Sequence, residues 1–248
     1  GIAGFPYVPN TDTDREEMLR AIGAESVEEL FSDIPPGLRL DRPLEVPGPL
    51  SEPELARHMS RLAGMNRTAD EVLSFLGGGI YDAYVPSAVS RVTGMPQFYT
   101  AYTPYQAEAS QGTLQAIYEF QTLVSRLSGM EVANASLYDG ATATAEAALL
   151  AVGATRRRKL AVSGTVSPAF REVLRTYVSS LGVDVLELPF VDGATDPKDV
   201  EDLADGAAAV IVQHPNFFGA LEPVTELRSS SSSAGALLVS VVDPLSLA

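Results

Sequence analysis

The C-terminal part of the chain alternates short apolar runs with amphipathic segments, and this alternation restricts the fold more than any other feature. The apolar runs predict strands at residues 160–162, 183–188, 208–212 and 237–242. The other segments predict helices at residues 87–93, 114–128, 141–153, 168–181 and 200–205, and one that ends at 229–234. Apolar strands separated by helices indicate an α/β fold with a mostly parallel, doubly wound sheet, because crossover helices cover both faces of such a sheet.

Residues 1–64 follow a different pattern and predict a helical and extended arm in front of a large domain at residues 65–248. Short helices are expected after capping residues near Thr11, at residues 27–31, and around Met59. Helices this short are rarely stable alone. We therefore expect the arm to wrap another surface.

The predicted large domain is incomplete at its C-terminal end. Its last strand runs into Asp243, and the sequence stops a few residues later. Open α/β domains bind ligands at the carboxyl ends of their strands, which is where Asp243 is expected. The pattern predicts a fragment of a longer α/β domain, or a shortened one.

The composition excludes several classes of function. The 248 residues contain no cysteine, which rules out disulfides, thiolate nucleophiles and cysteine-ligated metals. Two histidines, His58 and His214, are too few for a histidine-based metal site. A formal net charge of −15 disfavours a nucleic-acid partner, and no apolar run is long enough to cross a bilayer. We expect a cytoplasmic protein without a metal, a membrane anchor or a nucleic-acid partner.

A polar turn before the predicted helix at 141–153 suggests a site for an anionic ligand. Asp139 and Gly140 lead into this helix, and Thr142 follows within its first turn. Backbone N–H groups at a helix N-terminus, together with threonine hydroxyls, suit a phosphate group. An ordinary capped helix start explains the same residues equally simply.

The segment at residues 102–112 is the second polar motif. Pro104 fixes a turn between Tyr102 and Tyr105, and Ser110 can cap the helix that follows. Aromatic hydroxyls on a rigid loop can orient a polar ligand or stack on a ring. A buried polar loop at a subunit interface is the alternative.

Two more candidates lie at the ends of predicted strands. His214 can cover a planar cofactor ring or act as an acid–base group, and a hydrogen-bonded structural histidine is the alternative. Asp243 can pair with a pyridinium nitrogen. The alternative for Asp243 is a helix N-cap, with Pro244 at the first helical position.

Neither of the two lysines is placed for nucleophilic catalysis. Lys159 follows the arginines at 156–158, which suit a solvated face at a helix C-terminus, and Lys198 is expected in an exposed acidic loop. The serine run at 229–233 is weak helix material, expected to be an exposed helix end or a poorly defined segment.

Together these motifs resemble the glycine decarboxylases, the P-proteins of the glycine cleavage system. The matching residues are Thr103-Pro104-Tyr105-Gln106, Ser110-Gln111-Gly112, and residues 133–140, 145–147, 30–35, 78–82, 213–216 and 242–244. In many bacteria and archaea this enzyme is split into two homologous subunits. The sequence is most similar to subunit 1, the N-terminal half.

The resemblance implies a fold-type I pyridoxal-phosphate transferase fold. It also implies that the chain and a homologous subunit 2 together decarboxylate glycine through a pyridoxal-phosphate Schiff base and pass the aminomethyl group to the lipoyl arm of H-protein. In split enzymes the Schiff-base lysine belongs to subunit 2. The resemblance therefore implies no catalytic lysine here, pyridoxal phosphate held by the partner's lysine, and a chain that is inactive alone.

The family's site residues carry over to two sets of positions. The loop near the inter-subunit active site is matched by Thr103, Tyr105, Gln106, Glu108 and Ser110, with His214 as a further interface candidate. The cofactor positions of the catalytic homologue are matched by Asn134, Ser136, Gly140, Thr142 and Asp243, and are expected to be vestigial in this chain. Ser167-Pro168 departs from the His-Pro expected there. Two alternatives stay open: a structural, non-catalytic partner subunit, and a stand-alone pyridoxal-phosphate enzyme such as an aminotransferase.

Overall fold

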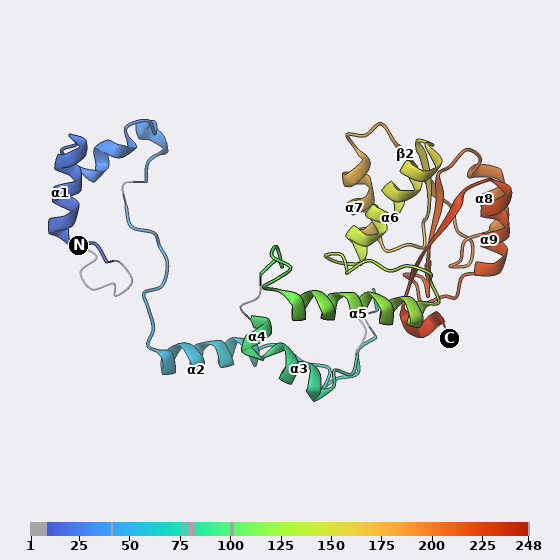
Figure 1. Cartoon of the computed structure of the whole chain (residues 1–248), viewed down its shortest axis with the longest axis horizontal. Coiled ribbons are helices and arrows are strands. Elements are labelled where there is room, and N and C mark those ends of the chain that lie inside the picture. Colours follow the sequence, from blue (N-terminus) through green and yellow to red (C-terminus); the bar gives the residue numbers. More distant parts are fainter. Residues whose placement is uncertain (1–8, 41, 76, 79–82, 100–101, 248) are drawn as a thin grey trace. The chain divides into compact units, whose positions relative to one another are not determined.

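The computed structural model describes residues 9–40, 42–75, 77–78, 83–99 and 102–247, and it divides into two units (Figure 1). The first unit runs to Thr68 and the second begins at Ala69. The boundary expected after residue 64 stays a prediction. Residues 79–82, which belong to the family resemblance, lie outside the described residues.

The elements of the described residues follow the alternation of the sequence. They are α1 (Asp12–Ile22), η1 (Val27–Phe31), η2 (Pro36–Leu38), α2 (Glu52–Ala63), α3 (Ser87–Thr93), α4 (Pro96–Tyr99), α5 (Gln111–Ser128), α6 (Gly140–Thr155), β1 (Lys159–Ser163), α7 (Pro168–Val178), β2 (Asp184–Leu188), α8 (Pro197–Leu203), β3 (Ala209–His214), α9 (Val224–Ser233), β4 (Leu237–Val242) and η3 (Pro244–Leu247). The predicted strands are confirmed. The helix predicted to reach residue 181 ends at Val178, and α4 and η2 were not predicted, whereas η3 agrees with the alternative given for Asp243.

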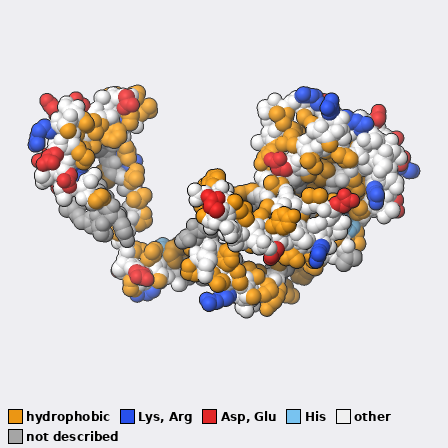
Figure 2. Space-filling model, in the orientation of Figure 1, with side chains coloured by type: hydrophobic (Ala, Val, Ile, Leu, Met, Phe, Trp, Pro, Cys, Tyr) orange, Lys and Arg blue, Asp and Glu red, His pale blue; other side chains and the backbone are white. Residues whose placement is uncertain are grey.

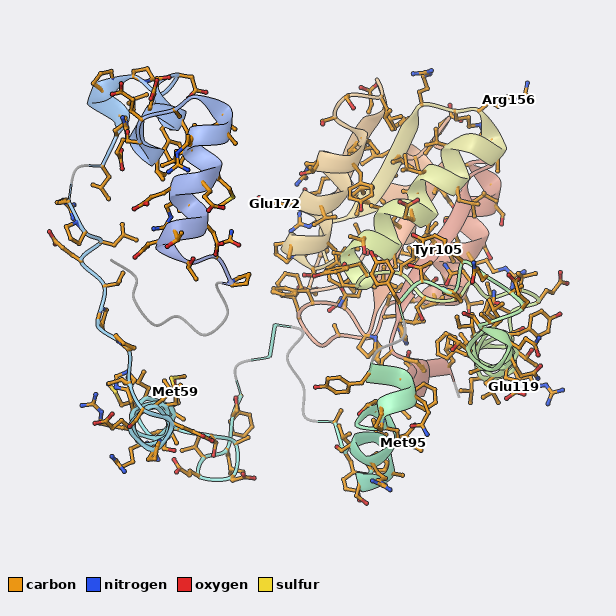
Figure 3. The ribbon with its side chains drawn as sticks, turned by 60° about the vertical axis from the view of Figure 1, so that its left-hand side comes forward. Met59, Met95, Tyr105, Glu119, Arg156 and Glu172 are labelled. Atoms are coloured by element: carbon orange, nitrogen blue, oxygen red, sulfur yellow. The ribbon has the colours of Figure 1, made fainter. Side chains whose placement is uncertain are left out.

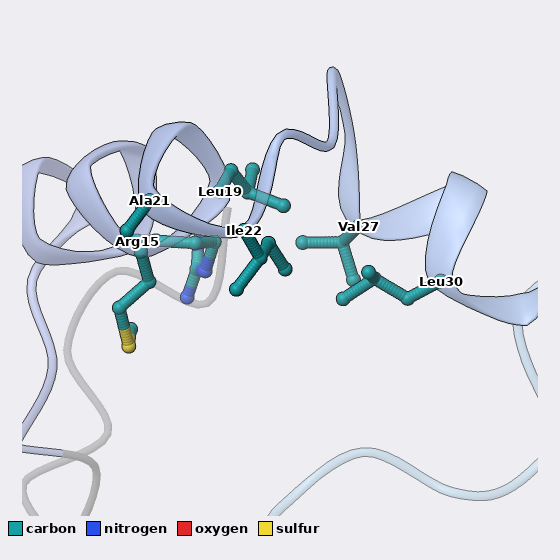
Figure 4. A pocket seen from close by; sticks show the side chains of 7 residues that line it. Arg15, Leu19, Ala21, Ile22, Val27 and Leu30 are labelled. Atoms are coloured by element: carbon teal, nitrogen blue, oxygen red, sulfur yellow. The ribbon is translucent and has the colours of Figure 1, made fainter.

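The first unit consists of short helices without a buried core. Helix α1 begins at a capping box, in which the Thr11 hydroxyl accepts from the backbone N–H of Asp14 at 3.2 Å, and it ends at Gly23 in the left-handed conformation. Its apolar face and η1 line an open groove of about 450 Å³ (Figure 4). No described residue of this unit is buried, and its hydrophobic side chains are exposed at the surface (Figure 2).

The second unit contains a four-stranded sheet of order β2-β1-β3-β4, and every neighbouring pair is parallel. Helices α6 and α7 cover one face, and α8 and α9 cover the other (Figure 1). Because side chains alternate along a strand, Leu160 and Ile211 pack under α6 and α7, whereas Val210 and Val212 pack under α8 and α9. Burial on both faces explains the continuous apolar runs of β1 and β3. Among the described residues, no helix is both long and apolar enough to cross a membrane.

The solvated face predicted at residues 156–158 is confirmed for Arg156 and Arg158, which are exposed, and is wrong for Arg157, which is half-buried (Figure 3). Arg157 Nη1 donates to the carbonyl oxygens of Ala207 at 2.9 Å and Gly235 at 2.7 Å. Arg158 Nη1 donates to the Leu181 carbonyl, and Lys159 Nζ donates to the carbonyls of Leu203 and Asp205. These cations bind carbonyl groups that helix ends and turns leave without backbone partners.

The serine run is also better ordered than expected. Ser230 and Ser231 belong to α9 and are buried. The Ser230 hydroxyl donates to Glu201 of α8 at 2.9 Å. Small side chains allow α9 to approach the neighbouring helix and sheet closely, which outweighs their weak helix propensity. Lys198 is exposed as expected, but it lies in α8 and not in a loop.

Candidate functional site

The carboxyl edge of the sheet contains a buried polar network centred on Glu222. This side chain is 4% exposed, and its carboxylate accepts from the Thr165 hydroxyl at 2.7 Å, the Asn216 amide at 2.8 Å and the Thr195 backbone N–H at 2.9 Å. The Ser163 hydroxyl extends the network to Thr165 and Thr195. Every buried side-chain nitrogen and oxygen of the described residues has a hydrogen-bond partner. The network is therefore fully satisfied and joins the loops that follow β1, β2 and β3.

The same loops are hydrogen-bonded to one another at the point where sheets of this kind bind ligands. The strand order places the switch point between β1 and β3. There the Phe217 backbone N–H donates to the Thr165 carbonyl at 2.9 Å, and the Ser167 N–H donates to Gln213 Oε1 at 2.8 Å. These two hydrogen bonds connect the loop after β1 with the end of β3 and the loop that follows it.

His214 is the last residue of β3 and lies on the face covered by α8 and α9. Its Nδ1 accepts the backbone N–H of Glu222 at 3.1 Å. A nitrogen that accepts a hydrogen bond carries no proton, so the neutral ring has its proton on Nε2. This geometry agrees with a hydrogen-bonded structural histidine and leaves Nε2–H as a donor.

We expect nuclear magnetic resonance to find the Nε2–H tautomer of His214. A long-range proton–nitrogen correlation of the imidazole rings at alkaline pH would show Nδ1 unprotonated, because the Glu222 amide stabilises this tautomer. The chain has one other histidine, so His58→Gln assigns the spectrum. A proton on Nδ1 of His214 would contradict the prediction.

The N-terminus of α6 is capped by the protein itself. The Asp139 carboxylate accepts the Thr142 backbone N–H at 2.8 Å, and the Thr142 hydroxyl lies 2.9 Å from the same oxygen. The Thr142 backbone N–H, followed by its hydroxyl, holds the pKa of the Asp139 carboxyl below its ordinary value. The Thr144 hydroxyl donates to the Gly140 carbonyl. Nearby, the Ser136 N–H donates to Asn134 Oδ1 at 3.0 Å.

A cavity of about 670 Å³ opens beside this helix start, at the carboxyl ends of β3 and β4. Its lining includes Asp243, Gln213 and Phe170, and the Phe170 ring also lies against Gly140. Asp243 Oδ1 accepts the Leu245 N–H at 2.9 Å and so caps η3, with Pro244 at the first position. The structure therefore places Asp243 and Phe170 in the lining of one cavity, and His214 lies on the opposite face of the sheet.

The loop at residues 102–110 is exposed. Tyr102 and Tyr105 are 85% and 81% exposed, and the Glu108 carbonyl accepts from the Gln111 side chain. Ser110 occupies the N-cap of α5, but its side chain makes no capping hydrogen bond, so the capping interaction expected of it is wrong. Among the described residues, Thr103, Tyr105 and Gln106 are not part of the cavity lining, and their roles stay a prediction.

Sequence reasoning missed Glu222 and Phe170. A single glutamate in a loop carries no signal of burial, because only the fold brings Thr165, Thr195 and Asn216 to it. Phe170 follows the proline that starts α7 and has the pattern of an ordinary core residue. Its position over Gly140 depends on the packing of two helices.

Comparison with known proteins identifies the family. The family described as glycine cleavage system P-protein matches residues 6–248. The chain belongs to this family. Two relatives named "Probable glycine dehydrogenase (decarboxylating) subunit 1" are similar over 97% of the chain, with 52% identity in Desulfitobacterium hafniense and 50% in Carboxydothermus hydrogenoformans. The P-protein homologue described here covers 54% of each, so it spans about half the length of these relatives.

Solved structures agree with this assignment. A crystal structure of glycine decarboxylase (P-protein) in inhibitor-bound form matches with a TM-score of 0.77 and 45% identity, over 97% of this chain and 54% of that one. A sphingosine-1-phosphate lyase from Burkholderia pseudomallei matches with a TM-score of 0.56 at 17% identity, which shows a shared fold alone. The expected fold class, that of the fold-type I pyridoxal-phosphate enzymes, is confirmed.

The residues at the carboxyl edge do not fit pyridoxal phosphate. The cofactor needs an amine for its aldehyde and a seat for its phosphate. Lys159 lies at the amino end of β1, where its Nζ donates hydrogen bonds to two carbonyl oxygens, and Lys198 lies in α8. At the start of α6, the Asp139 carboxylate accepts the Thr142 N–H, and the Phe170 ring lies against Gly140. Asp243 carries a carboxylate of the kind that can pair with a pyridinium nitrogen.

Proposed function

We propose that the chain acts as subunit 1 of a glycine dehydrogenase (aminomethyl-transferring, decarboxylating). With a homologous subunit 2 it decarboxylates glycine and passes the aminomethyl group to the lipoyl arm of H-protein. The observation that carries the proposal is the 50–52% identity, over 97% of the chain, to relatives named as subunit 1 of this enzyme. Pyridoxal phosphate, when bound by the lysine of the partner, supplies the electron sink for the decarboxylation.

The proposed contribution of this chain is one wall of the site. Tyr105 and Gln106 lie in an exposed loop, so their hydroxyl and amide groups are available to a neighbouring subunit. Tyrosine is favoured in such contacts because it combines a rigid apolar ring with a polar tip. These groups would orient a polar substrate in the partner's site, and the partner would supply the lysine.

The exposed hydrophobic side chains of the first unit support a partner. No described residue of this unit is buried, and Leu38, Leu44 and Val46 are 79%, 68% and 68% exposed. Contiguous apolar surface of this kind usually marks a site of contact with another protein.

The test is to replace Tyr105 and Gln106 in the assembled enzyme. Tyr105→Phe with Gln106→Leu removes the polar groups and keeps the size of the side chains. We expect an unchanged mass of the complex with subunit 2 and a glycine decarboxylation rate lower by about 10- to 100-fold, the usual range when substrate positioning is lost. Tyr177→Phe, on α7, is the matched control and should leave the rate unchanged.

Two other results would contradict the proposal. Unchanged decarboxylation with intact assembly would favour a structural partner subunit that does not touch the substrate. If the chain alone bound pyridoxal phosphate with the absorbance of a lysine-bound cofactor, a stand-alone enzyme such as an aminotransferase would be favoured.

A further inference from the structure

We propose that Phe170 and Asp139 together close the phosphate seat of this chain at the N-terminus of α6. The seat consists of the backbone N–H groups of the first turn of α6, beside the cavity that holds Asp243. In this view the chain's own side chains exclude phosphate ligands from the seat. The inference concerns ligand binding to this chain and does not depend on the proposed activity.

The first obstacle to a phosphate at the start of α6 is steric. A Cβ built on Gly140 would lie 2.9 Å from Phe170 Cζ and 3.1 Å from Cε2, so the ring touches the first residue of the helix. A Cβ in a helix points toward the N-terminus, which places the ring on the side from which an anion approaches. A phosphate oxygen must come within about 3 Å of the backbone nitrogen to accept its proton. The ring lies beside this approach and narrows it on the side of α7, although Gly140 itself is exposed.

The position of the ring is fixed by the start of α7. Pro168 occupies the first turn of this helix, and the Ser167 N–H preceding it is bound to Gln213 at 2.8 Å. One residue after the ring, Arg171 Nε donates to the Val166 carbonyl at 3.0 Å. Phe170 also packs against the core cluster beneath α6 and α7. The ring therefore cannot leave the helix start without loss of packing.

The second obstacle to a phosphate at this helix start is electrostatic. The Asp139 carboxylate accepts the Thr142 N–H and already neutralises the positive end of the helix dipole. The Thr142 hydroxyl is bound to Asp139, and the Thr144 hydroxyl is bound to the Gly140 carbonyl. A phosphate placed here would meet a negative charge and would find both threonine hydroxyls engaged. Closure thus has an apolar and a charged component.

The two components can be removed separately, the charge without loss of the cap and the ring at a cost in packing. Asn is as good an N-cap as Asp, so Asp139→Asn keeps the cap and removes the charge. Phe170→Ala removes the ring and connects the helix start to the cavity of about 670 Å³. Phe190→Ala is the matched control, because Phe190 touches Gly164 in the same manner, at 2.8 Å from its ideal Cβ, but away from the start of α6.

The experiment titrates the full chain with pyridoxamine 5′-phosphate, which has the phosphate and ring of the cofactor but no aldehyde to react with Lys159 or Lys198. Amide proton–nitrogen spectra follow Gly140 and Ala141, and pyridoxamine without phosphate serves as the ligand control. We expect no saturable shift of these amides in the natural chain or in Phe190→Ala. The double variant Asp139→Asn, Phe170→Ala should show a saturable shift. It should bind pyridoxamine 5′-phosphate at least 10-fold more tightly than the natural chain.

Three outcomes would overturn the inference. One is a saturable shift of the Gly140 and Ala141 amides in the natural chain. The second is no shift in the double variant when its spectrum retains the dispersion of a folded protein. The third is an equal response to pyridoxamine, since this would locate the binding in the cavity and not at a phosphate seat. If the double variant unfolds, Asp139→Asn with Phe170→Leu retains more packing and must show the same gain.

Discussion

Replacing Glu222 by glutamine is expected to lower the free energy of unfolding of the second unit by about 3 kcal/mol. The carboxylate accepts three hydrogen bonds and donates none, from Thr165, Asn216 and the backbone of Thr195. A glutamine has one oxygen, so in either orientation its NH₂ group faces the Asn216 amide or the Thr195 N–H. Chemical denaturation followed by circular dichroism measures the loss.

Glu172→Gln is the matched control for this change. Glu172 lies on the exposed side of α7 (Figure 3), and surface changes of this kind usually alter stability by less than about 0.5 kcal/mol. A loss at Glu222 no larger than the loss at Glu172 would mean that the network does not hold the loops together.

The second large effect is expected at Arg157. Arg157→Met keeps the length of the aliphatic stem but leaves the carbonyls of Ala207 and Gly235 without their donor. These carbonyls lie just before β3 and β4, where the backbone turns into the sheet. We expect a loss of about 2 kcal/mol in the free energy of unfolding, measured in the same way.

The neighbouring arginine provides the control for this prediction. Arg156 is exposed and has a left-handed backbone conformation (φ 58°), which methionine would share. Arg156→Met should therefore change stability by less than about 0.5 kcal/mol. Equal losses at both positions would show that the two carbonyls contribute nothing specific.

The sheet could be predicted from the sequence because its central strands are buried on both faces. A continuous apolar run such as 208–212 indicates a strand that is buried on both faces. The helices between such runs require the strands to be parallel. The helix start at Asp139 could be predicted for a different reason: the residues of the capping interaction lie within four positions of one another in the sequence. Local patterns therefore determined the architecture.

The candidate site could be predicted only in part, because its decisive contacts join distant residues. Nothing in the sequence near Glu222 indicates that Thr165 and Thr195 bind it, and nothing near Gly140 indicates that Phe170 covers it. Arg157 was assigned to solvent because its carbonyl partners lie far along the chain. Long-range hydrogen bonds and close packing have no local signature.

The absence of buried side chains from the described part of the first unit has a consequence for the fate of the chain in a cell. Helices without a core open at low free energy, so their backbone is accessible to proteases. A surface that covers this unit would shield it from cleavage. Proteolytic cleavage of the uncovered chain is therefore expected to begin in this unit, before the buried sheet of the second unit opens.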